Sequence, residues 1–153
     1  MTRATTMPAR PAIPDLSTWA ALPTYQAYEI LHIGYIVLPI VAGLDKFFHF
    51  LGIGSWEMYL APVATRITGL EATKFMMIVG AIECIAGLLV AIWPRAGGYV
   101  VMLWLWGIVA NLLMIPSGGP VGPFFDIALR DFGLSLGALA LARLSEDYGR
   151  PIR

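Results

Sequence analysis

The stretch Ala42–Gly52, AGLDKFFHFLG, ends an apolar run that begins near Tyr28 and is long enough to cross a membrane. At its end the run acquires Asp45, Lys46 and His49, three ionisable groups within five residues. Ionisable side chains in membrane helices are costly, and they usually face the bundle interior in pairs. The stretch therefore predicts a membrane helix with a polar site at one end.

The composition of the whole chain supports a membrane location. Of its 153 residues, 58% are hydrophobic and 13% are charged, and the mean hydropathy is +0.74. A soluble domain carries about 25% charged residues, so this chain has too little polar surface to face water on all sides. Its formal net charge is zero and it has no basic run or glycine-rich phosphate loop, so we exclude nucleic acid as a partner.

Four segments are apolar and close to the roughly 20 residues that a spanning helix needs. Backbone groups in lipid must bond internally, which favours helices and predicts an all-α bundle of four transmembrane helices. We expect the helices over Tyr28–Phe50, Thr73–Trp93, Gly98–Ile115 and Phe124–Leu144. The domain organisation is then an N-terminal arm, a transmembrane domain and a C-terminal tail, at residues 1–24, 25–145 and 146–153.

The connection Leu51–Ala72 is the one long link between the predicted spans, and it carries Trp56 and Tyr59. Aromatic side chains favour the membrane–water interface, so we expect a short interfacial helix or re-entrant cap here. Trp19 of the arm is expected at the lipid head groups for the same reason.

The basic residues predict the orientation in the membrane. Arginines outside the spans gather on the side that holds both termini: Arg3, Arg10, Arg95, Arg143, Arg150 and Arg153. By the positive-inside rule we expect both termini in the cytoplasm of an inner-membrane protein. The long connection and the polar end of the first span then face the extracytoplasmic side.

The polar ends of the first and fourth spans should meet, because successive spans alternate in direction. Asp45 and His49 share one helix face, as do Asp126 and Arg130 on the fourth span. We expect one intramembrane polar cluster, made of Asp45, Lys46, His49, Asp126, Arg130 and Asp131.

Two interpretations of this cluster remain open. It is either a paired network that specifies helix register or a cavity that binds a substrate, a quinone head group or a proton. A metal held by Asp45, His49 and another carboxylate has little support, because that spacing is common, and we predict no metal site. The sequence marks no resident cofactor and leaves a quinone or a lipid at the helix bundle as the open ligand class.

Glu83 lies near the middle of the second predicted span with no charged neighbour in its own helix. It should be protonated or paired, and Asn111 is the nearest partner by depth. The pair would be either a structural hydrogen bond or a proton-relay or ligand site. Gly80 and Gly87 share the face of Glu83, which predicts close helix packing there.

Small residues and tryptophans give two further expectations. Gly133 and Gly137 form a GxxxG motif, typical of a helix-packing surface. Trp93, Trp104 and Trp106 are expected as lipid-facing anchors or packing residues.

Several segments resemble the DoxX-like family of small four-helix membrane proteins. They are PIVAGLDKFFHFLG, SWEMYLAP, IVGAIECIAGLLVAIWPRAGGYV and ALRDFGLSLGALALA, between residues 39 and 142. The family pattern of a Gly and a Lys near the end of helix one, followed by an aromatic loop, would be Gly43, Lys46 and Trp56. The resemblance implies an association with quinol oxidation and thiosulfate:quinone oxidoreduction, or with partners of redox enzymes. The single cysteine, Cys84, departs from a dithiol-exchange mechanism.

Three function classes follow. The favoured one is a small, non-catalytic subunit or accessory protein of a membrane electron-transfer complex, quinone-linked, respiratory or photosynthetic, packed against larger integral membrane subunits and membrane lipid. The second is a DoxX-like oxidoreductase acting on quinol or a sulfur compound through the polar cluster. The third is a proton-coupled small-solute transporter, which the absence of an internal repeat weakens.

Overall fold

The computed structural model describes residues 20–52, 54–116 and 122–149. These residues form helices and no strand, which confirms the all-α class. The elements are α2 (Pro23–Phe48), the 3₁₀ helix η1 (Trp56–Tyr59), α3 (Pro62–Thr68), α4 (Ala72–Ile92), α5 (Pro94–Leu113) and α6 (Phe125–Tyr148). Most of the predicted arm, including Trp19, lies outside the described residues.

Three of these helices, α2, α4 and α5, are long and apolar enough to cross a membrane, and they indicate an integral membrane protein. The predicted fourth span corresponds to α6, which is not among them. α6 is long enough to cross a membrane, but it carries Asp126, Arg130 and Asp131 near its start and further charged residues near its end. The bounds also differ from the prediction: α2 begins before Tyr28, with Pro23 at a position that favours proline, and α6 runs past Leu144.

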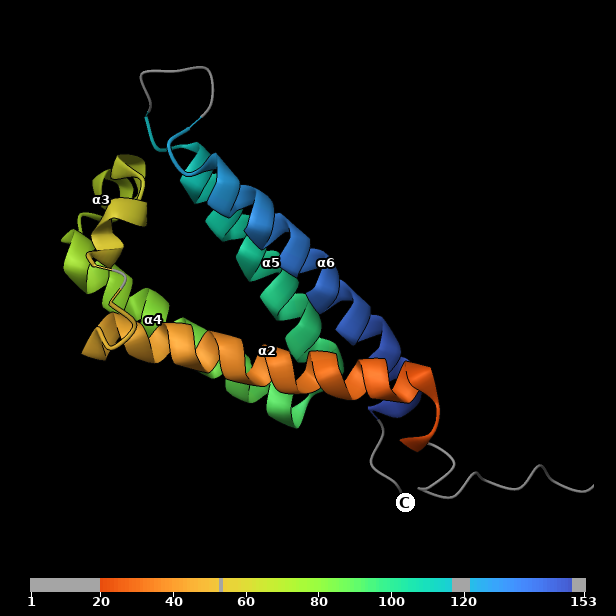
Figure 1. Cartoon of the computed structure of the whole chain (residues 1–153). Coiled ribbons are helices and arrows are strands. Elements are labelled where there is room, and N and C mark those ends of the chain that lie inside the picture. Colours follow the sequence, from red (N-terminus) through yellow and green to blue (C-terminus); the bar gives the residue numbers. More distant parts are fainter. Residues whose placement is uncertain (1–19, 53, 117–121, 150–153) are drawn as a thin grey trace, which may run out of the picture.

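The helices are arranged as two arms of a wedge (Figure 1). One arm is α2 packed along α4, and the other is α5 packed along α6. The arms meet at the narrow end, where Trp93 is the single residue between α4 and α5 and where Gly97 lies against Val90. They separate toward the wide end, across which η1 and α3 lie (Figure 1).

Glycines allow the α2–α4 arm to pack backbone against backbone. A Cβ at Gly43 or at Gly80 would collide with the carbonyl oxygen of the other, and a Cβ at Gly87 would collide with Ile36 and Ile40. Close contacts of this kind are typical of small residues in membrane helices. The predicted packing of the Gly80–Gly87 face is thus confirmed.

The GxxxG motif of α6 contributes only one of its glycines to packing. Gly137 lies against the ring of Tyr35, whose hydroxyl donates a hydrogen bond to the Leu134 carbonyl. Gly133 has no described atom within 4 Å of where a Cβ would stand. Within the described chain, therefore, only Gly137 of the motif takes part in helix packing.

Candidate functional site

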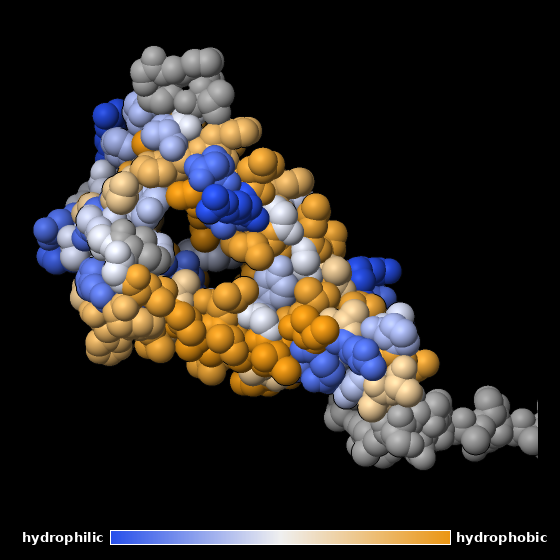
Figure 2. Space-filling model, in the orientation of Figure 1, coloured by the Kyte–Doolittle hydropathy of each residue, from blue (hydrophilic) through white to orange (hydrophobic). Residues whose placement is uncertain are grey.

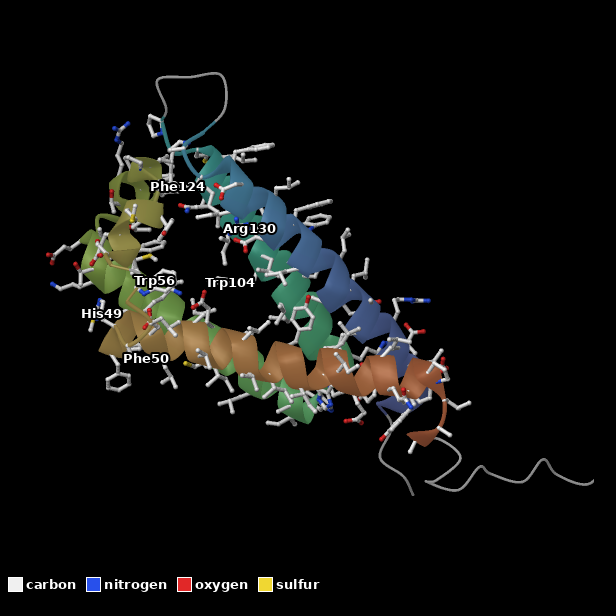
Figure 3. All side chains as sticks on the ribbon, viewed as in Figure 1. His49, Phe50, Trp56, Trp104, Phe124 and Arg130 are labelled. Atoms are coloured by element: carbon white, nitrogen blue, oxygen red, sulfur yellow. The ribbon has the colours of Figure 1, made fainter. Side chains whose placement is uncertain are left out.

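A cavity of about 990 Å³ lies between the two arms of the wedge. Figure 2 shows apolar residues over much of the outer surface and a hollow at the centre. The walls are mostly hydrophobic, and the polar or aromatic groups on them include Lys46, Trp56, Glu83, Trp104, Asn111, Arg130 and Asp131. Figure 3 places Trp56, Trp104 and Arg130 around this hollow, on three different elements.

The centre of the site is a buried ion pair between α2 and α4. Lys46 Nζ lies 2.6 Å from Glu83 Oε2, and the two side chains are 4% and 10% exposed. Lys46 follows Gly43 by three residues, and Glu83 follows Gly80 by three, on antiparallel helices in close contact. Side chains lean toward the N-terminus of their own helix, so these two converge. Their charges are consequently matched where little water can reach them.

This pairing corrects the prediction that Asn111 is the partner of Glu83. Asn111 instead holds the long connection: its Oδ1 accepts from the Ala61 backbone N–H at 2.9 Å, and its Nδ2 donates to the Tyr59 carbonyl at 2.6 Å. The side chain therefore fastens η1 and the start of α3 to α5.

Asp45 is also occupied by the long connection rather than by α6. It is 1% exposed, and it accepts from the Leu51 backbone N–H at 2.6 Å and from Trp56 Nε1 at 2.8 Å. These bonds hold the Trp56 ring over the ion pair, with its centroid 4.0 Å from Lys46 Nζ. Such a cation–π contact stabilises the ammonium group and covers it.

The connection has its own polar contact outside the membrane helices. Ser55 Oγ donates to Glu57 Oε2 at 2.5 Å, and this bond is the largest of the effects that lower the pKa of Glu57. The predicted interfacial aromatics lie in this segment: Tyr59 packs on Phe124, with 4.9 Å between ring centroids, and Trp56 covers Lys46.

The six residues of the predicted cluster lie in different places and have different partners. Asp131 lines the cavity wall opposite the ion pair and is near enough to interact electrostatically with Lys46 and Glu83. Arg130 lines the rim and pairs with Asp126 at 3.6 Å, both largely exposed. His49 ends α2 in a left-handed conformation and is exposed. A single cluster of six is therefore not formed.

Trp104 is the cavity residue whose role the sequence prediction missed. Its Nε1 is buried near the Glu83 carboxylate but outside hydrogen-bond geometry. No polar pattern in the surrounding sequence marks it. Trp93 is exposed, as expected for an anchor, and Trp106 donates to Ser135 Oγ at 2.9 Å.

The cavity combines mostly apolar walls with a few polar groups. Largely apolar pockets with a few convergent polar groups are typical of ligand sites. Each arm contributes both signs of charge, Lys46 and Glu83 on the α2–α4 arm and Arg130 and Asp131 on α6, and the Trp56 indole covers Lys46. Within the described ranges, no group of three His, Cys, Asp or Glu side chains could hold one metal ion.

Comparison of the chain with protein-family models, with curated proteins and with solved structures finds no match. The DoxX-like resemblance therefore rests on the short motifs quoted above, and the function has to be argued from the cavity.

Proposed function

We propose that this chain is a four-helix, DoxX-like membrane protein that binds the head group of a quinone-class lipid as a small subunit or accessory protein of a membrane electron-transfer complex. The observation that carries the proposal is the Lys46–Glu83 pair on the wall of an apolar cavity of about 990 Å³. A buried charged pair is costly to keep, and both residues of this pair line the cavity.

The polar groups of the cavity suit a quinone head group better than a fully apolar or a charged ligand. A quinone carbonyl needs a hydrogen-bond donor, and Lys46 is a cationic donor on one wall. A quinol hydroxyl needs an acceptor, and Glu83 and Asp131 are carboxylates on facing walls. The flat faces of Trp56 and Trp104 offer stacking surfaces for a ring.

The membrane arrangement in this proposal includes α6 as the fourth span. It packs along α5, with Ala138 and Ala142 against Gly98, and no charged residue lies between Phe132 and Ala142. Arg130 and Asp131 line the cavity and Arg130 pairs with Asp126 near the start of α6, so neither charge lies in the middle of the span. With the arginine distribution described above, both termini would be cytoplasmic and the wide end of the wedge extracytoplasmic.

Binding can be tested with the full chain in lipid nanodiscs by titrating a methylated benzoquinone and following tryptophan fluorescence. Two of the five tryptophans, Trp56 and Trp104, line the cavity, so a bound quinone should quench them. We expect the neutral double variant Lys46→Met/Glu83→Gln to bind at least about tenfold more weakly, a loss of about 1.4 kcal/mol. Asp126→Asn, which changes a charge outside the cavity lining, is the matched control and should bind normally.

The subunit role needs a separate measurement. The chain would be extracted from native membranes in a mild detergent, separated by size, and its co-migrating proteins identified by mass spectrometry. Co-migration with dehydrogenase, cytochrome or photosynthetic subunits is expected. A lone small species that still binds quinone would contradict the subunit role and favour a self-contained oxidoreductase.

A further inference from the structure

A second, smaller cavity of about 280 Å³ adjoins the main one between α4 and α5. Its lining is Ile82, Ala86, Val100, Leu103 and Trp104. Ile82, Ala86 and Trp104 line both cavities. The two spaces therefore border on the same side chains, and Val100 and Leu103, which line only the smaller one, are exposed on the outer surface.

The helix geometry explains why a groove forms at this place. Trp93 is the single residue between α4 and α5, so the two helices start together and diverge along their lengths (Figure 1). Ala86 presents only a methyl group at the seam, whereas Val100 and Leu103 on α5 are exposed. In a membrane, the outer end of this groove would open to lipid.

We propose that the groove between α4 and α5 holds the hydrocarbon chain of the ligand whose head group lies at the Lys46–Glu83 pair. This inference rests on the proposed function. The groove has no charged side chain, and burying a polar group there without a partner would be unfavourable. A chain attached to a head group in the main cavity needs an apolar exit, and this groove borders that cavity, with three of its five lining residues in common.

The groove selects its occupant by shape rather than by hydrophobic attraction. Lipid tails are as apolar as leucine, so moving a hydrocarbon chain from the bilayer into the groove yields little hydrophobic free energy. Filling the groove with protein atoms would instead exclude the chain sterically. The critical experiment is therefore to block the groove and to compare ligands with and without a chain.

The test uses Leu103→Trp in the full-length protein in nanodiscs, with a methylated benzoquinone as one probe and the same head group with a decyl chain as the other. Leu103 is more than half exposed, so the variant should fold. Leu136→Trp on α6 is the matched control, since Leu136 is similarly exposed and lines neither cavity. Leu103→Phe provides an intermediate degree of filling.

We expect Leu103→Trp to weaken binding of the decyl probe about tenfold or more and to leave the chainless probe unchanged, with Leu103→Phe in between. Leu136→Trp should change neither. Equal effects of Leu103→Trp on both probes, or no effect on either, would overturn the chain subsite while leaving head-group binding in place. If neither probe binds the unaltered protein, the proposed function fails together with this inference.

Discussion

The two arms of the wedge are both pairs of long helices, but they place their charges differently. In the α2–α4 arm, Gly43 and Gly80 bring the backbones into contact, and Lys46 and Glu83 form a buried pair beside them. In the α5–α6 arm the packing relies on Gly98 against alanines and on a bond from Trp106 to Ser135. The ion pairs of that arm, such as Arg130 with Asp126, are largely exposed.

In the α2–α4 arm, the buried ion pair depends on the close backbone contact beside it. Without Gly43 and Gly80 the helices would stand further apart, and Lys46 could not reach Glu83 in shelter from water. The α5–α6 arm has no such pair to protect, so its role at the site is to supply the opposite wall. Variants in equivalent positions of the two arms should therefore differ in their cost.

The largest difference is expected between Lys46→Met and Arg130→Met. Lys46→Met leaves the buried Glu83 without its counter-charge and should lower the free energy of unfolding by about 3–5 kcal/mol. Arg130→Met removes a largely exposed partner and should cost less than about 1 kcal/mol. Denaturant titration in detergent, followed by tryptophan fluorescence, measures both, and equal losses would contradict the distinction between the arms.

A second contrast compares glycines. Gly80→Ala places a Cβ against the Gly43 carbonyl oxygen and should lower the free energy of unfolding by up to about 3 kcal/mol. Gly133→Ala meets no described atom within 4 Å, so only the helix propensity of alanine acts, and it should be neutral or stabilise by up to about 1 kcal/mol. Thermal unfolding of both variants tests this, and a stabilised Gly80→Ala would show that the α2–α4 contact is looser than described.

Side-chain hydrogen bonds give a third contrast. Asn111→Leu leaves the Ala61 N–H and the Tyr59 carbonyl unpaired and should cost about 2 kcal/mol. It should also release residues 51–72 to protease, which limited proteolysis detects. Trp106→Phe, which loses the bond to Ser135, should cost about 1 kcal/mol without changing proteolysis of that segment. Full protection in Asn111→Leu would mean that other contacts hold the connection.

The smallest effect concerns Glu57 in the connection itself. Because its pKa is lowered in the folded protein, chiefly by the Ser55 hydroxyl, its contribution to stability is present above the ordinary carboxyl pKa. That contribution is lost as the pH falls through the lowered pKa. Ser55→Ala should raise the pKa of Glu57 toward its ordinary value, as NMR titration would show. Thr65→Ala, whose hydroxyl bonds Pro62 instead, should leave the Glu57 pKa unchanged.

The sequence predicted the helices well because hydropathy is a local property. Thr73–Trp93 corresponds to α4 within one residue at each end, and the aromatic connection became η1 and α3. Lys46 and Glu83 both lie in apolar segments of the sequence, which is why both were marked as groups that need partners.

What the sequence could not provide was the rotation of each helix and the choice of neighbour. Lys46 was assigned to the fourth span because the end of the first span was expected to meet the start of the fourth, whereas glycine contact places it against α4. A usable signal was present: Gly43 and Lys46 have the same three-residue spacing as Gly80 and Glu83, so each charge lies on the face that packs most closely. Trp104 had no comparable signal, because its place in the cavity lining depends on how far apart the two arms lie.

The bonds of Asn111 at the wide end have a mechanical consequence. The two arms and the connection that joins them form a triangle, with one corner at Trp93, one at Asn111 and one at the end of α2. Because the two helical arms and the connection are joined at all three corners, the angle between the arms is fixed, and a cavity remains between them. A rotation of about 5° at Trp93 would move the far end of a 30 Å helix by about 3 Å. The two hydrogen bonds of Asn111 and the Tyr59–Phe124 ring contact oppose this movement, so they help to keep the cavity between the arms open.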